Sequence, residues 1–104
     1  MTHLVQVLLP LCDNDGRPFP HALYTQVKAE LTERYGGLTA YTRSPAEGIW
    51  REEESSPTTH DEVIVMEVMC DVLDRPWWAA YRLQLTQRFQ QRELVVRALP
   101  FEPL

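Results

Sequence analysis

The sequence predicts an α+β fold in which strands and helices follow one another in the order strand–helix–strand–strand–helix–strand. Three observations predict it: apolar residues alternate with a period of two in the strand segments, they recur every three to four positions in two longer segments, and the two halves of the chain resemble each other. The 104 residues fit one domain, residues 1–104. We expect a four-stranded antiparallel sheet with both helices on one face.

The first half of the chain contains a strand, a helix and a second strand. Residues 3–12 alternate as a strand does, and residues 19–35 have the four-residue spacing of a helix with one buried stripe, carried by Leu23, Val27 and Leu31. Gly36 and Gly37 end that helix. Residues 38–43 predict the second strand, which a kink at "SPAEG" interrupts before "IWRE" resumes it.

The second half repeats this order. The acidic stretch "EEESSPTTHDE" predicts a solvated hairpin tip, and Glu62–Cys70 is an almost unbroken apolar strand. Residues 75–92 predict a helix with Asp74 as its N-cap and Pro76 in its first turn. Residues 93–99 close the chain as a fourth strand.

An internal repeat supports this organisation. Residues 5–35 align without a gap on residues 63–93 with nine identities in 31 positions, and the stretches "LCDNDGRP" and "MCDVLDRP" then read as one strand-to-helix turn written twice. Two β-α-β halves in a small chain are the ferredoxin-like arrangement. Right-handed crossovers predict that the first and third strands lie side by side and parallel at the sheet centre, which would make Cys12 and Cys70 neighbours.

The third strand is apolar on both faces. Val63, Val65 and Met69 share one face, and Ile64, Met66 and Val68 share the other. Two helices cover only one face of such a sheet, so we expect a second copy to cover the other.

This layout resembles the dimeric α/β-barrel superfamily, whose members are small ferredoxin-like domains paired into a barrel. The segments "RYGGLTAY…GIW" and "YRLQLTQRFQQRELVVR" are also similar to small uncharacterised domains of that shape. The resemblance implies a homodimer that pairs through its sheets, and it implies no particular activity.

Composition excludes some classes of partner. The net charge of −5, from 15 acidic and 10 basic residues, disfavours binding to nucleic acid. No apolar run approaches the roughly 20 residues of a membrane span, and the N-terminal residues lack a basic leader. Two cysteines in such a chain indicate reduced thiols, so we expect a cytoplasmic protein.

Cys12 and Cys70 have two interpretations. They are either a redox-active or metal-binding thiol pair with Asp13 and Asp71 nearby, or small buried residues at equivalent positions of a duplicated turn. The absence of a C-x-x-C spacing favours the second interpretation, with no metal and no cofactor.

Glu67 is an acid in the middle of a strand that is otherwise apolar, and its partner in the repeat is Leu9. A carboxylate at such a position requires a partner or acts on a ligand. It is interpreted either as part of a structural ion pair or as a general base, a role for which His3 is the second candidate. The expected companions of Glu67 are Arg43, Tyr41, Arg97 and His3. The predicted ligand-binding residues are Tyr41, Arg43, Trp50 and Arg97.

Three hypotheses of function follow. The first is a homodimeric domain that binds a small organic ligand or a protein partner. The second is a cofactor-independent enzyme of the α/β-barrel kind, an isomerase or monooxygenase, with Glu67 or His3 as general base. The third is a thiol or metal site at Cys12 and Cys70.

Overall fold

The chain forms the elements that the sequence predicts, in the predicted order. The computed structural model describes residues 2–50 and 59–104, and for residues 42–50 and 59–62 it describes the backbone alone. The elements are β1 (His3–Pro10), α1 (His21–Tyr35), β2 (Thr39–Trp50), β3 (Thr59–Cys70), α2 (Arg75–Arg88) and β4 (Val96–Pro100). The predicted tip "EEESSPTTHDE" falls largely on residues 51–58, outside the described residues.

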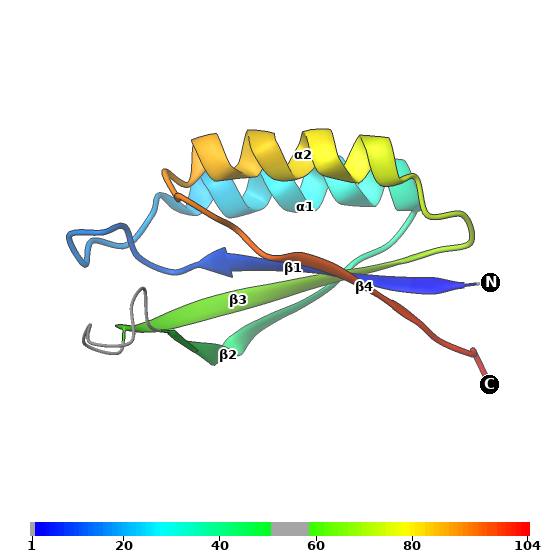
Figure 1. Cartoon of the computed structure of the whole chain (residues 1–104), viewed down its shortest axis with the longest axis horizontal. Helices are drawn as coiled ribbons and strands as arrows, with labels where there is room; N and C mark the ends of the chain where they lie inside the picture. The colour runs from blue at the N-terminus through cyan, green and yellow to red at the C-terminus, as the bar shows by residue number, and fades with distance from the viewer. Residues whose placement is uncertain (1, 51–58) are drawn as a thin grey trace.

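The strands form one sheet in the order β2-β3-β1-β4, and both helices cover the same face of it (Figure 1). Every neighbouring pair of strands is antiparallel. The chain therefore has the ferredoxin-like α+β fold. No helix of the described residues is long and apolar enough to cross a membrane.

The expectation that β1 and β3 run parallel is wrong. These strands are adjacent but antiparallel, with His3 opposite Cys70 and Pro10 opposite Val63. The physical reason lies in the split β-α-β topology: each helix connects two parallel strands that are not neighbours, and a strand of the other unit is inserted between them in the opposite direction.

The cysteines therefore do not meet. Cys70 is the last residue of β3. Cys12 follows the end of β1, and the last residue of β1, Pro10, lies opposite Val63, seven residues before Cys70 in β3. That separation corresponds to roughly 23 Å of strand. The predicted proximity of the two thiols is wrong.

The two similar stretches also form different turns. In "LCDNDGRP", the Asp13 carboxylate accepts hydrogen bonds from the backbone N–H groups of Asp15 and Arg17, both at 2.9 Å, and Gly16 takes a positive φ of 79°. In "MCDVLDRP", Cys70 still belongs to β3, and Asp74 caps α2 by accepting from the Trp77 N–H at 3.1 Å. Asp13 and Asp74 are the turn and cap residues that the sequence predicts, but they do not occupy equivalent turns.

The gapless alignment of the two halves pairs residues of β1 with residues of β3 that face the other side of the sheet. The residues of β1 under the helices have odd numbers, and those of β3 have even numbers: Val5, Val7 and Leu9 against Ile64, Met66 and Val68. The offset of 58 that pairs buried Val27 with buried Leu85 in the helices thus pairs opposite faces in the strands.

The core lies between the helices and the covered face of the sheet. It includes the strand residues just named and Cys70, together with Tyr24, Val27 and Leu31 from α1, Trp78, Tyr81, Leu85 and Phe89 from α2 or its C-cap, and Leu94. Trp77, half-buried, stacks on Tyr81 with ring centroids 4.8 Å apart.

Candidate functional site

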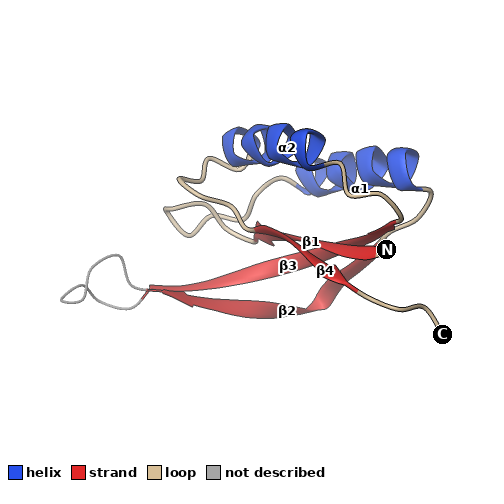
Figure 2. Cartoon of the chain, turned by 45° about the vertical axis from the view of Figure 1, so that its right-hand side comes forward, coloured by secondary structure: helices blue, strands red, loops and turns tan. Residues whose placement is uncertain are grey.

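Within the described residues, no helix or strand packs on the face of the sheet opposite the helices (Figure 2). Cross-strand register assigns to this face a set of half-buried or exposed apolar residues from all four strands: Leu4, Leu8, Tyr41, Val63, Val65, Met69, Val95 and Leu99. Met69 is 62% exposed and Leu99 is 45% exposed. We call this surface the uncovered face.

A chain of polar side chains crosses the uncovered face at its middle. Arg97 Nε donates to Gln6 Oε1 at 2.6 Å, and Gln6 Nε2 donates to Glu67 Oε1 at 2.7 Å. Tyr41 donates its hydroxyl to the second oxygen, Glu67 Oε2, at 3.2 Å. These four residues come from β4, β1, β3 and β2 in that order across the sheet, and we call them the polar ladder.

Strand register explains why these side chains meet. Gln6 lies directly opposite Glu67 on one side and Arg97 on the other, and Tyr41 lies opposite Val65, two residues from Glu67. Side chains directly opposite or diagonal across antiparallel strands are within contact distance. The ladder is therefore built into the rigid centre of the sheet.

The hydrogen bonds of the ladder determine its electrostatics. Gln6 bridges the Arg97 guanidinium and the Glu67 carboxylate, so within the described residues Glu67 makes no direct ion pair. The nearby Glu67 charge, reinforced by their hydrogen bond, raises the pKa of Tyr41. The Glu67 carboxylate thus lies on an otherwise apolar surface, with Gln6 and Tyr41 as its hydrogen-bond partners and Arg97 one side chain away.

The structure brings together three of the residues that the sequence predicts for the site, Glu67, Tyr41 and Arg97. It adds Gln6, which sequence reasoning missed. The signal was present, because Gln6 is a polar residue between Leu4 and Leu8 on one face of a central strand.

His3 does not belong to this site. It has the same parity along β1 as Val5 and Val7, so it lies on the covered face, at the end of the sheet, opposite Cys70. Its Nδ1 is buried and lacks a hydrogen-bond partner in the described part of the chain. His3 therefore cannot share a ligand with Glu67 on the other face, so the expectation that it is a companion of Glu67 is wrong, and its role as a general base stays a prediction.

The side chains of Arg43 and Trp50 lie outside those that the structure describes. The backbone of Arg43 lies in the segment between Tyr41 and Ala46, where the β2–β3 register shifts. Trp50 pairs with Thr59, eight residues along β3 from Glu67, which corresponds to roughly 26 Å of strand. The structure does not bring Trp50 near the ladder.

The cysteines give no thiol pair. Both are free, with Cys12 exposed and Cys70 buried, and burial raises the pKa of the Cys70 thiol, as does the nearby Asp71. Within residues 2–50 and 59–104, no group of three or more histidine, cysteine or acidic side chains is placed to hold a metal ion.

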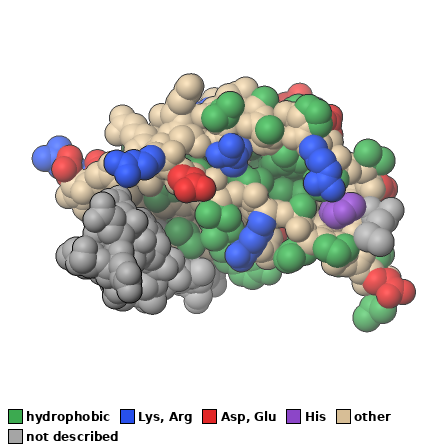
Figure 3. All heavy atoms as spheres, viewed as in Figure 1, with side chains coloured by type: hydrophobic (Ala, Val, Ile, Leu, Met, Phe, Trp, Pro, Cys, Tyr) green, Lys and Arg blue, Asp and Glu red, His purple; other side chains and the backbone are tan. Residues whose placement is uncertain are grey.

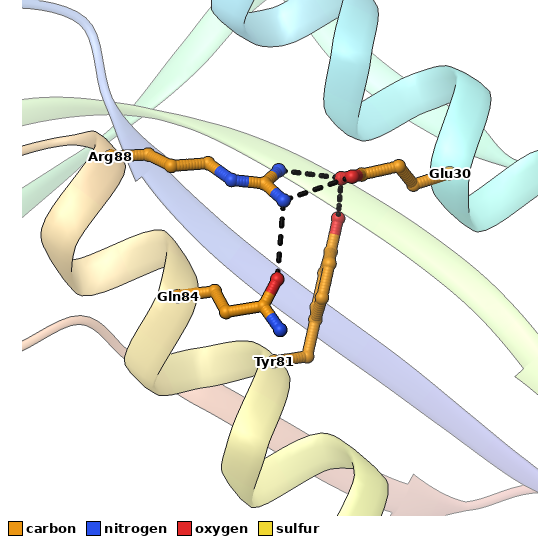
Figure 4. A network of polar contacts seen from close by, with 4 residues as sticks. All are labelled: Glu30, Tyr81, Gln84 and Arg88. Atoms are coloured by element: carbon orange, nitrogen blue, oxygen red, sulfur yellow. Dashed lines mark hydrogen bonds and ion pairs between the residues drawn. The ribbon is translucent and has the colours of Figure 1, made fainter.

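A second polar cluster connects the two helices (Figure 4). Glu30 of α1 accepts from both terminal nitrogens of Arg88, at 2.5 and 2.9 Å, and from the Tyr81 hydroxyl at 2.9 Å. Hydrogen bonding to Arg88 lowers the pKa of Glu30, and burial raises the pKa of Tyr81. Arg88 also donates to Gln84 Oε1 at 3.2 Å. Because each polar group has a partner, the cluster joins the two helices, and we call it the clamp.

Fold and site together define a class: a ferredoxin-like α+β domain with one uncovered, mostly apolar sheet face that a polar ladder crosses. The chain matches no family model and no curated protein sequence. Among solved structures it is similar to a phage SAM lyase in complex with S-methyl-5′-thioadenosine, with 13% sequence identity and a TM-score of 0.61. The match covers 94% of this chain and 80% of that chain, and at this identity it shows the fold alone.

Proposed function

We propose that this protein binds a small organic ligand on the uncovered face, with the polar ladder as the recognition element and a second copy of the chain enclosing the site. The observation that carries the proposal is the ladder itself. Four hydrogen-bonding side chains are positioned by adjacent strands in the middle of an apolar surface. Apolar walls with a few fixed polar groups are the usual composition of a small-molecule site.

The comparison supports the class of ligand. The phage SAM lyase with this fold was solved with S-methyl-5′-thioadenosine, a small molecule with both apolar and hydrogen-bonding groups.

A cytoplasmic location remains part of the proposal, because both cysteines are free.

Charge complementarity supports a second copy as the enclosing partner. The ladder is positive at Arg97 on β4 and negative at Glu67 on β3. A two-fold axis parallel to the strands through β1 would place Arg97 of each copy over Glu67 of the other. An axis perpendicular to the strands would oppose like charges, so the ladder favours the first arrangement.

Backbone amide shifts in an NMR titration test ligand binding, with S-methyl-5′-thioadenosine as the first probe and a set of small polar aromatic fragments as the second. We expect saturable shifts at Gln6, Glu67 and Arg97. Glu67→Gln should weaken binding about tenfold, the loss of one charged hydrogen bond. Glu33→Gln, an exposed change on α1, is the matched control and should leave binding unchanged.

Shifts confined to other surfaces, or equal binding by the Glu67 and Glu33 variants, would overturn the proposal.

The second candidate, a cofactor-independent enzyme with Glu67 as general base, is favoured by the carboxylate on the uncovered face, which no arginine contacts directly within the described residues. It requires that new product signals grow during the titration with the wild type. A Glu67→Gln variant that still forms product would exclude this role.

A further inference from the structure

A shallow groove of about 270 Å³ runs between α2 and β4, on the side of the molecule away from the uncovered face. Its apolar lining includes Leu73 and Trp78 from the helix side and Val96 and Ala98 from the strand. Figure 3 shows basic side chains around the apolar area between α2 and β4. The groove is separate from the polar ladder, with which it shares only Arg97 as a boundary residue.

The strand side of the groove presents backbone donors. Val95 accepts at its carbonyl from the Leu8 N–H at 3.0 Å, and the Phe101 N–H donates to Thr2 at 3.1 Å. Odd-numbered residues of β4 therefore direct their backbone groups toward β1. Because antiparallel pairing alternates, Val96 and Ala98 direct both their N–H and their C=O groups outward from the edge of the sheet, and both residues line the groove.

The helix side presents cations. Arg75 and Arg82 are seven residues apart on α2, two turns of one helix face, and both line the groove. None of the described residues that line it is acidic, and Asp74, which precedes Arg75, pairs with Arg34 at 3.3 Å and accepts from the Trp77 N–H. The groove is thus rich in donors and positive charge in a protein whose net charge is −5.

Arg97 is less available than the other two, because its Nε is held by Gln6. The side chains of Arg75 and Arg82 have no hydrogen bond or ion pair with the described residues. Two unengaged guanidinium groups beside two outward N–H groups are the arrangement that carboxylates and phosphates prefer.

We infer that this groove is a second binding site, for a small organic anion with a carboxylate or phosphate monoester head and an apolar body. Arg75 and Arg82 and the strand N–H groups hold the head, and Leu73 and Trp78 contact the body. The volume is near the lower end of small-molecule sites, so the body is about the size of one aromatic ring. This inference does not depend on ligand binding at the polar ladder.

NMR titration of the full chain with benzoate and with phenyl phosphate tests it, and the two probes distinguish a carboxylate head from a phosphate head. At least one of them should shift the Val96 and Ala98 amides saturably. Arg82→Gln should weaken that binding about tenfold, as expected for one charged hydrogen bond. Arg17→Gln, which removes the same charge from an exposed turn, should not alter it.

Four results would overturn the inference. Binding of phenol, the neutral analogue, as tight as that of phenyl phosphate would leave only an apolar groove. If inorganic phosphate binds as tightly as phenyl phosphate, the apolar body of the ligand contributes nothing to binding, and the groove is not a site for an organic anion. Equal affinity of wild type and the Arg82 variant, with shifts located elsewhere, would remove the site itself. Shifts at Glu67 alone would support the ladder site and contradict this one.

Discussion

Glu30 is the acceptor for both partners from the opposite helix, so it is the residue through which α1 and α2 are clamped. Glu30→Gln leaves Arg88 and Tyr81 with a neutral side chain that has one acceptor oxygen instead of two. We expect the free energy of unfolding to fall by about 1–2 kcal/mol at neutral pH, measured by urea denaturation. Glu33→Gln, on the exposed side of the same helix, should cost less than about 0.5 kcal/mol.

The same pair of variants has a defined pH dependence. The Arg88 hydrogen bonds lower the pKa of Glu30 in the folded chain below the usual 4.5. The folded state then releases the proton more readily, so the Glu30 contribution is complete above pH 4.5 and is lost as the pH falls through the lowered folded pKa. The stability gap between wild type and Glu30→Gln should close in acid, and a gap independent of pH would contradict the clamp.

The contribution of Tyr24 to stability should be lost in alkali rather than in acid. Its hydroxyl donates to the Pro10 carbonyl at 2.5 Å, and burial raises its pKa from 10.0 to about 12. The folded chain holds this proton more tightly, so the Tyr24 contribution is complete below pH 10 and is lost between pH 10 and 12.

Tyr24→Phe tests this assignment. The variant should be less stable than wild type by about 1 kcal/mol at pH 7, because the Pro10 carbonyl loses its donor. That difference should shrink above pH 10, where the wild type alone loses the Tyr24 proton. Chemical denaturation at several pH values measures both effects, and a difference that grows with pH would refute the burial effect. Part of the alkaline loss should remain in the variant, since the pKa values of Tyr35 and Tyr81 are also raised.

At the residue scale, sequence reasoning placed His3 beside Glu67, whereas the two lie on opposite faces of the sheet, and the error has a physical reason. A period of two shows which residues of one strand share a face, but it does not show which of the two faces the helices cover. That choice depends on packing between elements. Cross-strand register, which places Gln6 between Glu67 and Arg97, is likewise a tertiary property.

At the scale of elements, Asp74 is the side chain that begins α2. It accepts from the Trp77 N–H at 3.1 Å and also pairs with Arg34 at 3.3 Å on the surface. Asp74→Ala should lower the free energy of unfolding by about 1 kcal/mol, mainly through the lost cap, because exposed ion pairs contribute little.

Asp74→Ser distinguishes the two contributions. Serine keeps a capping oxygen and removes the charge, so it should retain most of the stability. Asp71→Ala, an exposed change just after β3, is the control and should be close to neutral in thermal or urea unfolding. If the serine variant loses as much as the alanine variant, the ion pair is the important interaction and the cap is not.

The helices were predictable because each has a buried stripe with helical spacing, whereas their ends depend on local backbone conformation. The second helix was predicted to reach residue 92, but α2 ends at Arg88. Gln90 takes a positive φ of 51°, and the chain then turns so that Leu94 is buried in the core. Glutamine and arginine are good helix formers, so nothing in their local propensity indicates this stop.

At the scale of the molecule, the repeat predicted the right order of elements and the adjacency of β1 and β3, but the wrong relative direction of these strands and the wrong turns. The sequence similarity of the two Cys-Asp stretches conceals a difference in length: ten residues connect β1 to α1, and four connect β3 to α2. With the helices aligned, the strands must end at different positions, which moves Cys70 into a strand and Cys12 into a turn. Similar residues at aligned positions do not guarantee equivalent backbone when connections differ.

The proposed two-fold pairing makes a prediction for two charge-reversed chains. In an Arg97→Glu homodimer, each introduced acid would face Glu67 of the other copy, and in a Glu67→Arg homodimer each introduced base would face Arg97. Both variants should therefore be monomeric at micromolar concentrations at which the wild type is dimeric, as measured by analytical ultracentrifugation. Mixing the two variants should restore a dimer, because both contacts then join opposite charges. Recovery in the mixture also controls for folding, since misfolded chains would not pair. A monomeric wild type would refute the dimer, and two variants that dimerise as well alone as together would refute the axis parallel to the strands.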